Sequence, residues 1–236
     1  MHRYPPESKF SLSDFDSKRE SNSTNNGQNF EQLEKYLINP YVQVEILREG
    51  RSGRLLYRVT TEELGKTEAE ELEALKKLFL KILGEISPPP LQSEMEGFIR
   101  KEITMYFENE GKVIGERALS HIQYLLTRDF LGYGKIDPIM NDSNIEDISC
   151  DGVKIPIYVY HKKYQNIKTN LKFDDERELD NFIVLLAQKG NRQISISDPL
   201  LDASTPEGNR INATFGNEVT TRGGTFSIRL FKHAPF

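Results

Sequence analysis

Three arginines near the C-terminal end of the sequence have the spacing to bind a phosphate-like anion. Arg210 and Arg229 each occupy a polar position in a segment where polar and apolar residues alternate, and Arg222 lies in the glycine-containing stretch between them. The guanidinium group is planar, stays charged, and donates two parallel hydrogen bonds to phosphate or carboxylate oxygens. The three residues together therefore predict an anion site.

The segments that carry Arg210 and Arg229 are predicted to be paired strands. In 209–215 and 225–231 apolar residues recur at every second position, which is the period of a half-buried strand. The stretch 216–224 between them contains three glycines, as expected of a hairpin loop. A slip of one residue would turn an apolar set to solvent, so the apolar faces must coincide when the strands pair. The polar faces then coincide too, which puts both arginines on one side of the sheet.

This part of the sequence resembles the N-terminal half of the secretion-type ATPases, the hexameric motors of type II secretion, type IV pili and the archaeal flagellum (archaellum). The resemblance rests on DPLLDASTPEGNRINATFGNEVTTRGGTFSIRLF at 198–231 and on DPIMNDSNIEDISCDG at 137–152. The strings TTRG and TFSIR resemble the archaeal branch. The resemblance is strong over about 135–232, moderate over about 30–135 and absent over 1–29.

The resemblance implies a role for the three arginines. In the family a PAS-like N-terminal domain precedes a RecA-like ATPase domain, and its arginines approach the phosphates of the ATP that the second domain holds. By position these would be Arg210, Arg222 and Arg229. One position departs from the family: Glu207 precedes Gly208 where aspartate–glycine is expected, a change that bears on the turn more than on charge.

The resemblance also implies partners and cofactors. ATP and Mg²⁺ belong to the intact protein, and the chain ends at Phe236 before any Walker A sequence. We therefore expect no catalytic residue in this chain, no ATP hydrolysis by it alone and no tight ATP binding. The implied partners are its own C-terminal ATPase domain, neighbouring subunits of a homohexamer and a polytopic membrane platform protein, which would bring the protein to the inner face of the membrane.

A free-standing PAS-like module that binds a small ligand or a partner is the alternative interpretation. A Walker A sequence, GxxxxGK[ST], in a continuation of the reading frame past Phe236 would distinguish the two. Nucleic-acid binding ranks behind both, because 31 Lys and Arg face 36 Asp and Glu, a net charge of −5, without a basic stripe.

Other motifs in the sequence predict no further chemistry. The tripeptide Gly65-Lys66-Thr67 lacks the earlier glycine of a P-loop, since position 60 is a threonine. The four histidines are scattered and have no cysteine companions, so no metal site is predicted. A single cysteine, Cys150, indicates a reducing compartment. With no apolar run of the ~20 residues that span a bilayer and no signal peptide, a cytoplasmic protein is expected.

The predicted fold class is α+β, with a flexible tail (1–29), a helical N-terminal subdomain with a small β-hairpin (30–134), and a PAS-like antiparallel sheet with helix cover (135–236). Capping boxes begin two of the helices, at 67–70 and 93–96. The helix over 175–190 is expected to bury Leu179, Phe182, Ile183, Leu186 and Ala187. The predicted helices are 30–38, 67–86, 93–108, 116–130 and 175–190, and the remaining strands are 42–48, 54–60, 146–150, 155–160 and 165–170.

Overall fold

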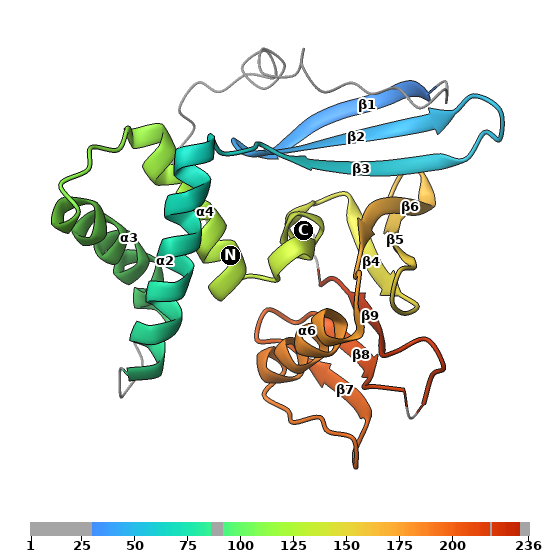
Figure 1. The fold of residues 1–236 in the computed structure, drawn as a ribbon. Coiled ribbons are helices and arrows are strands. Elements are labelled where there is room, and N and C mark those ends of the chain that lie inside the picture. The colour runs from blue at the N-terminus through green and yellow to red at the C-terminus, as the bar shows by residue number, and fades with distance from the viewer. Residues whose placement is uncertain (1–29, 86–91, 218, 232–236) are drawn as a thin grey trace, which may run out of the picture. The chain divides into compact units, whose positions relative to one another are not determined.

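The computed structural model describes residues 30–85, 92–217 and 219–231 (Figure 1). Within them the chain is α+β, as predicted. It divides into two compact units: a sheet unit, which runs up to Thr61 and resumes at Pro138, and a helical unit, Glu62–Asp137. This division differs from the predicted segments, because the N-terminal hairpin belongs to the sheet unit. The predicted flexible tail, 1–29, lies outside the described residues.

In the described part of the sheet unit, nine strands form one sheet in the order β1-β2-β3-β6-β5-β4-β9-β8-β7. Neighbouring strands are antiparallel except β3 and β6, which run parallel. The antiparallel sheet predicted over 135–236 is confirmed, since β4 to β9 pair with one another only in antiparallel fashion, and the N-terminal hairpin enlarges it through the parallel β3–β6 pair. The strands are β1 Phe30–Asn39, β2 Val42–Glu49, β3 Leu55–Thr61, β4 Ile145–Cys150, β5 Pro156–His161, β6 Gln165–Lys172, β7 Leu200–Ser204, β8 Arg210–Thr214 and β9 Thr225–Arg229.

The first strand corrects the prediction of a helix over 30–38. The four-residue spacing of Leu33 and Leu37 suggested a helix, but the segment pairs with β2 as an antiparallel strand. Its register shifts twice along the pairing, and each such irregularity displaces the alternation of side chains. The chain then reverses through a turn in which Asn39 Oδ1 accepts a hydrogen bond from the Tyr41 amide at 2.8 Å.

Helix α6, Glu176–Lys189, packs its apolar side against the sheet and contacts β8 (Figure 1). Its N-terminus is capped by Asp175, whose carboxylate accepts from the Glu178 amide at 2.9 Å. Rings from helix and sheet meet in the core, with centroid distances of 5.1 Å for Phe182–Phe226 and 5.1 Å for Phe173–Phe182. All five residues predicted to form the core face of this helix are buried.

The helical unit contains α2 (Lys66–Glu85), α3 (Gln92–Asn109) and α4 (Glu116–Phe130), which confirms the three predicted helices. The cap of α2 lies two residues earlier than predicted: Glu68 Oε2 accepts from the Gly65 amide at 2.9 Å. Gly65 has no side chain to complete a capping box, so the predicted box at 67–70 is wrong. The serine of the second predicted box belongs to a side chain outside those described. A short helix, η1 (Gly134–Ile136), follows α4, and α5 (Asp137–Asn141) begins at the boundary between the units.

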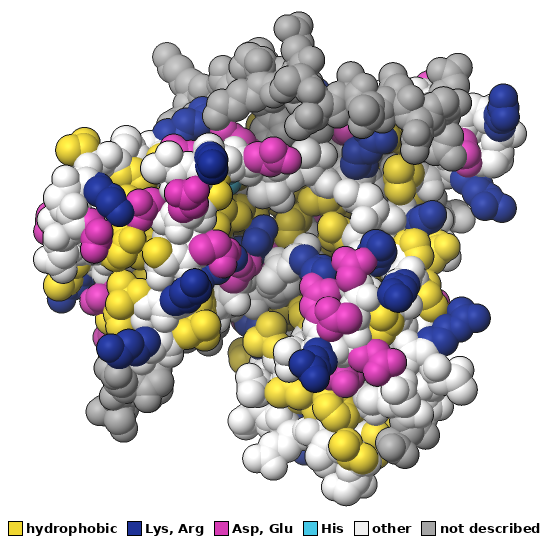
Figure 2. All heavy atoms as spheres, viewed as in Figure 1, with side chains coloured by type: hydrophobic (Ala, Val, Ile, Leu, Met, Phe, Trp, Pro, Cys, Tyr) yellow, Lys and Arg dark blue, Asp and Glu magenta, His cyan; other side chains and the backbone are white. Residues whose placement is uncertain are grey.

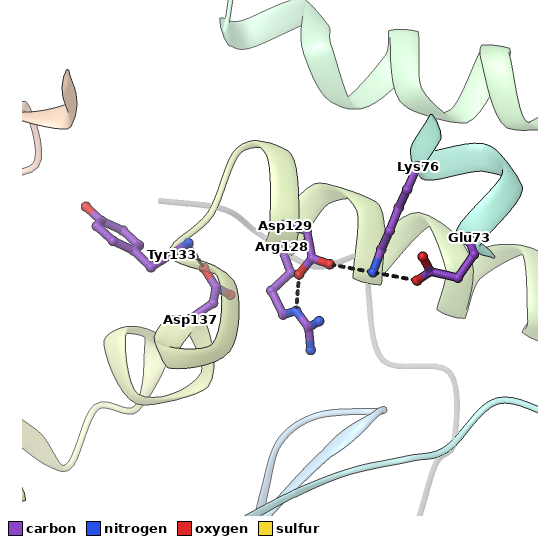
Figure 3. Close-up of polar contacts among 6 residues, drawn as sticks. All are labelled: Glu73, Lys76, Arg128, Asp129, Tyr133 and Asp137. Atoms are coloured by element: carbon purple, nitrogen blue, oxygen red, sulfur yellow. Dashed lines mark hydrogen bonds and ion pairs between the residues drawn. The ribbon is translucent and has the colours of Figure 1, made fainter. Parts of the chain in front are cut away.

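Polar contacts tie α2 to α4 and close the turn after α4 (Figure 3). Lys76 Nζ lies 3.2 Å from Asp129 Oδ2, and such partly exposed pairs contribute about 0–1 kcal/mol each. After α4, Asp137 Oδ1 accepts from the Tyr133 amide at 3.0 Å. A Cβ on Gly132 would lie 2.3 Å from that same carboxylate oxygen, so the turn requires glycine there.

Inside the sheet unit, one carboxylate joins the N-terminal strands to the segment before β4. The hydroxyls of Tyr36 and Tyr57 both donate to Asp142 Oδ2 at 2.6 Å, while Asp142 Oδ1 accepts from the Asn144 amide at 2.8 Å. Burial, together with the adjacent carboxylate, raises the pKa of both tyrosines, which keeps their hydroxyls protonated as donors. Residues from β1 and β3 are thereby fixed to the turn that starts β4.

Removing one of these donors is expected to destabilise the sheet unit. Tyr57→Phe deletes a hydrogen bond to a buried carboxylate, a loss of about 1.5–3 kcal/mol in the free energy of unfolding. Urea denaturation of the parent and the variant measures the difference. Tyr160→Phe is the control, because that ring is 40% exposed and its change should stay within about 0.5 kcal/mol. Equal denaturation midpoints for the parent and Tyr57→Phe would contradict this role for Asp142.

Candidate anion-binding site

The predicted pairing of the two arginine strands is confirmed. Strands β8 and β9 are antiparallel, with Arg210 opposite Arg229 and Ile211 opposite Ile228. Both isoleucines are fully buried, whereas both arginines are exposed. The two guanidiniums therefore start from directly opposed positions on the outer face of the sheet, the face turned away from the buried residues.

Each arginine is paired with a carboxylate on its far side. Arg229 Nε donates to Asp147 Oδ1 of β4 at 2.9 Å, and Arg210 Nη2 donates to Asp202 Oδ2 of β7 at 3.1 Å. Across β4, β9, β8 and β7 the charges thus run negative, positive, positive, negative. The Asp147 carboxylate raises the pKa of Arg229. The two guanidiniums in the middle repel each other, so an anion placed between them would relieve that repulsion.

These ion pairs are open to exchange with a ligand. The arginine side chains are 62% and 76% exposed, and ion pairs at such sites contribute only about 0–1 kcal/mol. A phosphate-like anion could therefore take the place of either carboxylate at small cost. Bidentate donation by arginine would favour that exchange.

The arginines open into a hollow of about 480 Å³ at this end of the sheet. Phe231 forms part of its wall and packs beside Gly208, whose φ of +91° suits glycine. The turn thus keeps the expected glycine, and the departure at Glu207 falls on an exposed position. The arginine hollow is lined by Glu146, Asp147, Lys162, Gly208, Arg210, Arg229, Leu230 and Phe231.

The third predicted residue, Arg222, lies elsewhere on the hairpin. The ladder runs from Arg210–Arg229 at one end to Thr214–Thr225 at the other, about 13 Å away at ~3.3 Å per residue. Arg222 lies beyond that second end, so the structure brings Arg210 and Arg229 together and places the Arg222 backbone apart from them. Its carbonyl accepts from the Val153 amide at 3.0 Å, which holds this part of the loop against the turn after β4.

Lys162, which sequence reasoning missed, joins the hollow from the turn between β5 and β6. Its amide donates to Asn144 O at 2.9 Å. The preceding residue, His161, accepts from the amides of Lys163 and Tyr164 through Nδ1, at 3.1 and 3.3 Å. An imidazole that accepts at Nδ1 carries its proton on Nε2 and is neutral. Burial favours the same neutral form and lowers the pKa of His161.

Metal ligands and membrane spans are not evident in the described ranges. No group of three or more His, Cys, Asp and Glu side chains there could hold a metal ion. Over the same ranges, no helix combines the length and the apolar character needed to cross a bilayer.

No family model matches the chain. The chain is 36% identical over 151 residues to the uncharacterized protein MJ1288 of Methanocaldococcus jannaschii. The matched region covers 61% of this chain and 60% of that protein. Two longer proteins of the same organism match as well: MJ0900, 34% identical over 59% of this chain and 25% of its own length, and MJ0781, 36% identical over 50% and 16%. The chain therefore spans less than two thirds of each of these relatives.

One solved structure with a partial likeness is the VirB11 ATPase from the Brucella suis type IV secretion system, in complex with sulphate. The match has 18% sequence identity and a TM-score of 0.35, and covers 42% of this chain and 30% of that one. A likeness at that TM-score does not establish a shared fold.

The loop that carries Arg222 is expected to depend on Gly152. This glycine has a φ of +126°, and a Cβ on it would lie 2.5 Å from the Arg222 carbonyl oxygen. Gly152→Ala should therefore lower the free energy of unfolding by about 1–3 kcal/mol and expose the loop 216–224 to protease. Gly53→Ala is the control, because Gly53 also has positive φ but has nothing within 4 Å of a Cβ. Equal losses in the two variants would show that the contact with Arg222 is unimportant.

His161 is expected to make stability sensitive to mild acid. Its pKa is lowered in the folded chain, so below the unfolded value of about 6.5 the unfolded state binds the extra proton. The free energy of unfolding should therefore fall as pH decreases from about 6.5 towards the folded pKa. In His161→Asn the amide oxygen can replace Nδ1 as acceptor without titrating, so denaturation between pH 7 and 5 should show a shallower fall. The same slope in parent and variant would refute the assignment.

Proposed function

We propose that this chain is the N-terminal regulatory and assembly part of a secretion-type hexameric ATPase that powers an archaellum, a type IV pilus or a secretion machine. The observation that carries the proposal is the register of β8 and β9, which sets Arg210 and Arg229 side by side on an exposed face. The segment 198–231, on which the resemblance rests, contains both of these strands. Two of the relatives extend well beyond the matched region, as expected if this chain corresponds to one part of a longer protein.

In this proposal the arginines act on the phosphates of ATP held, with Mg²⁺, by the following ATPase domain. Phosphoryl transfer is catalysed mainly by positioning and by stabilising charge on the phosphate oxygens. Arg210 and Arg229 would exchange their carboxylate partners for phosphate oxygens when the ATPase domain closes on this face. Closure would also exclude water and strengthen each charge interaction. Arg222, held at the other end of the hairpin, would contact the nucleotide separately.

The distribution of surface charge agrees with a partner other than nucleic acid. Acidic and basic side chains are interspersed over the face that Figure 2 shows, and its described atoms form no continuous basic stripe. The net charge of −5 points the same way.

A free-standing ligand-binding module is the second candidate. A second hollow, of about 550 Å³, lies along the outer face and is lined by polar residues such as Ser149 and Asn212 together with apolar ones such as Leu200. A Walker A sequence in the continuous reading frame would favour the ATPase, and its absence the module.

The arginines are expected to serve turnover rather than folding. In the protein extended by its ATPase domain, Arg210→Ala, Arg222→Ala and Arg229→Ala should each lower ATP turnover at least about 10-fold, or ~1.4 kcal/mol of barrier. Lysine should rescue poorly, because it lacks two-pronged donation. In the isolated chain each alanine should change the free energy of unfolding by less than about 1 kcal/mol.

The control is Arg177→Ala, since Arg177 is exposed in the first turn of α6 and does not line the arginine hollow. It should leave turnover unchanged. Parental turnover in the three arginine variants, or unfolding of the isolated chain by them, would contradict the proposed function.

A further inference from the structure

We propose that Lys162 is a third cation of the arginine hollow, and that the hollow takes an oligophosphate chain rather than a single phosphate. This rests on the proposed function only in that it assigns the same ligand, nucleotide phosphates, to Arg210 and Arg229.

The sheet topology brings Lys162 to the arginines. Strands β5, β4, β9 and β8 are consecutive neighbours and all antiparallel, so the end of β5, the start of β4, the end of β9 and the start of β8 meet at one edge. Lys162 follows the end of β5, Arg229 ends β9 and Arg210 starts β8. All three line the same hollow, although Lys162 belongs to a different hairpin.

The ammonium group of Lys162 differs from the two guanidiniums of the hollow in its ion pairing. It forms no ion pair with any residue that the structure describes, whereas Arg229 and Arg210 are paired with Asp147 and Asp202. The next residue, Lys163, is bound to Glu34 at 2.6 Å. The backbone of Lys162 is fixed by the hydrogen bond that its amide donates to the Asn144 carbonyl, so a flexible side chain starts from a rigid turn.

The spacing of the cations indicates the class of ligand. Adjacent strands lie about 4.8 Å apart, so Arg210 and Arg229 are one spacing apart and Lys162 begins about two spacings beyond Arg229. Two neighbouring guanidiniums suffice for one phosphate group. A cation two strands further on suits a chain of phosphates, whose charges are distributed along its length.

The carboxylates in the hollow limit the affinity of any anion, so the number of cations that a ligand reaches matters. Glu146 and Asp147 lie on β4, between Lys162 and Arg229, and oppose any anion. Three cations against two carboxylates leave a single net positive charge in the lining. A ligand that contacts only the arginines binds weakly, because Asp147 repels it and already neutralises Arg229. A ligand that also reaches Lys162 is attracted by a further cation.

The test is an NMR titration of the 236-residue chain at low ionic strength, where exposed charges are least screened. Sodium tripolyphosphate and inorganic phosphate are titrated separately into the parent, Lys162→Gln and Lys163→Gln. We expect tripolyphosphate to bind the parent at least about fivefold more tightly than phosphate, and Lys162→Gln to lose about that factor for tripolyphosphate alone. Lys163→Gln, the matched control on the same turn, should stay within about twofold.

Three results would overturn the inference: parental affinity in Lys162→Gln, an equal loss in Lys163→Gln, or no binding of tripolyphosphate by the parent. The double variant Arg210→Ala/Arg229→Ala separates this inference from the proposed function. If it loses both anions while Lys162→Gln loses neither, the arginine site stands and the role of Lys162 falls. The proposed function fails independently, through unchanged turnover in the arginine variants of the extended protein.

Discussion

The register of β8 against β9 is the constraint on which the candidate site depends. Ile211, Ile228 and Phe226 are buried on the inner side of these strands, and burial of each such side chain contributes about 1.5–3 kcal/mol. A slip of one residue would expose them and bury two guanidiniums. The opposed arginines repel each other by less than about 1 kcal/mol at their exposed positions. The hydrophobic core therefore holds two like charges together.

The flanking strands determine how that repulsion is balanced in the ligand-free chain. Asp147 on β4 and Asp202 on β7 each neutralise the nearer arginine, so the row carries little net charge. An anion must displace or share these carboxylates, which limits its affinity for the exposed face. Closure of another domain over the row would remove water and raise the value of each contact. A weak site in the isolated chain is thus compatible with a stronger one in the proposed assembly, where a second domain would cover the row.

Local patterns predicted the parts of the fold that rest on one hairpin or one helix. The alternation of apolar and polar residues predicted the register of β8 and β9, and the 3.6-residue period of apolar residues predicted the buried face of α6. The strand at 30–39 was missed because its irregular pairing obscures the alternation. Strand β7 was also missed, because it has only five residues and its alternation of apolar and polar residues is too short to be recognised. Lys162 could not be found, because only the order of distant strands brings it to the arginines.

The helical unit is inserted between β3 and the start of β4, and this clarifies what each part of the chain can do. Every residue that lines the arginine hollow belongs to the sheet unit, as do Tyr36, Tyr57 and Asp142, which bind its N-terminal strands to its later ones. Among the described residues, the candidate anion site is thus built from the sheet unit alone. The helical unit has its own core of residues such as Phe79, Ile103 and Leu126. A contact with a partner protein can thus be sought on the helices by mutation without altering the arginines or Lys162.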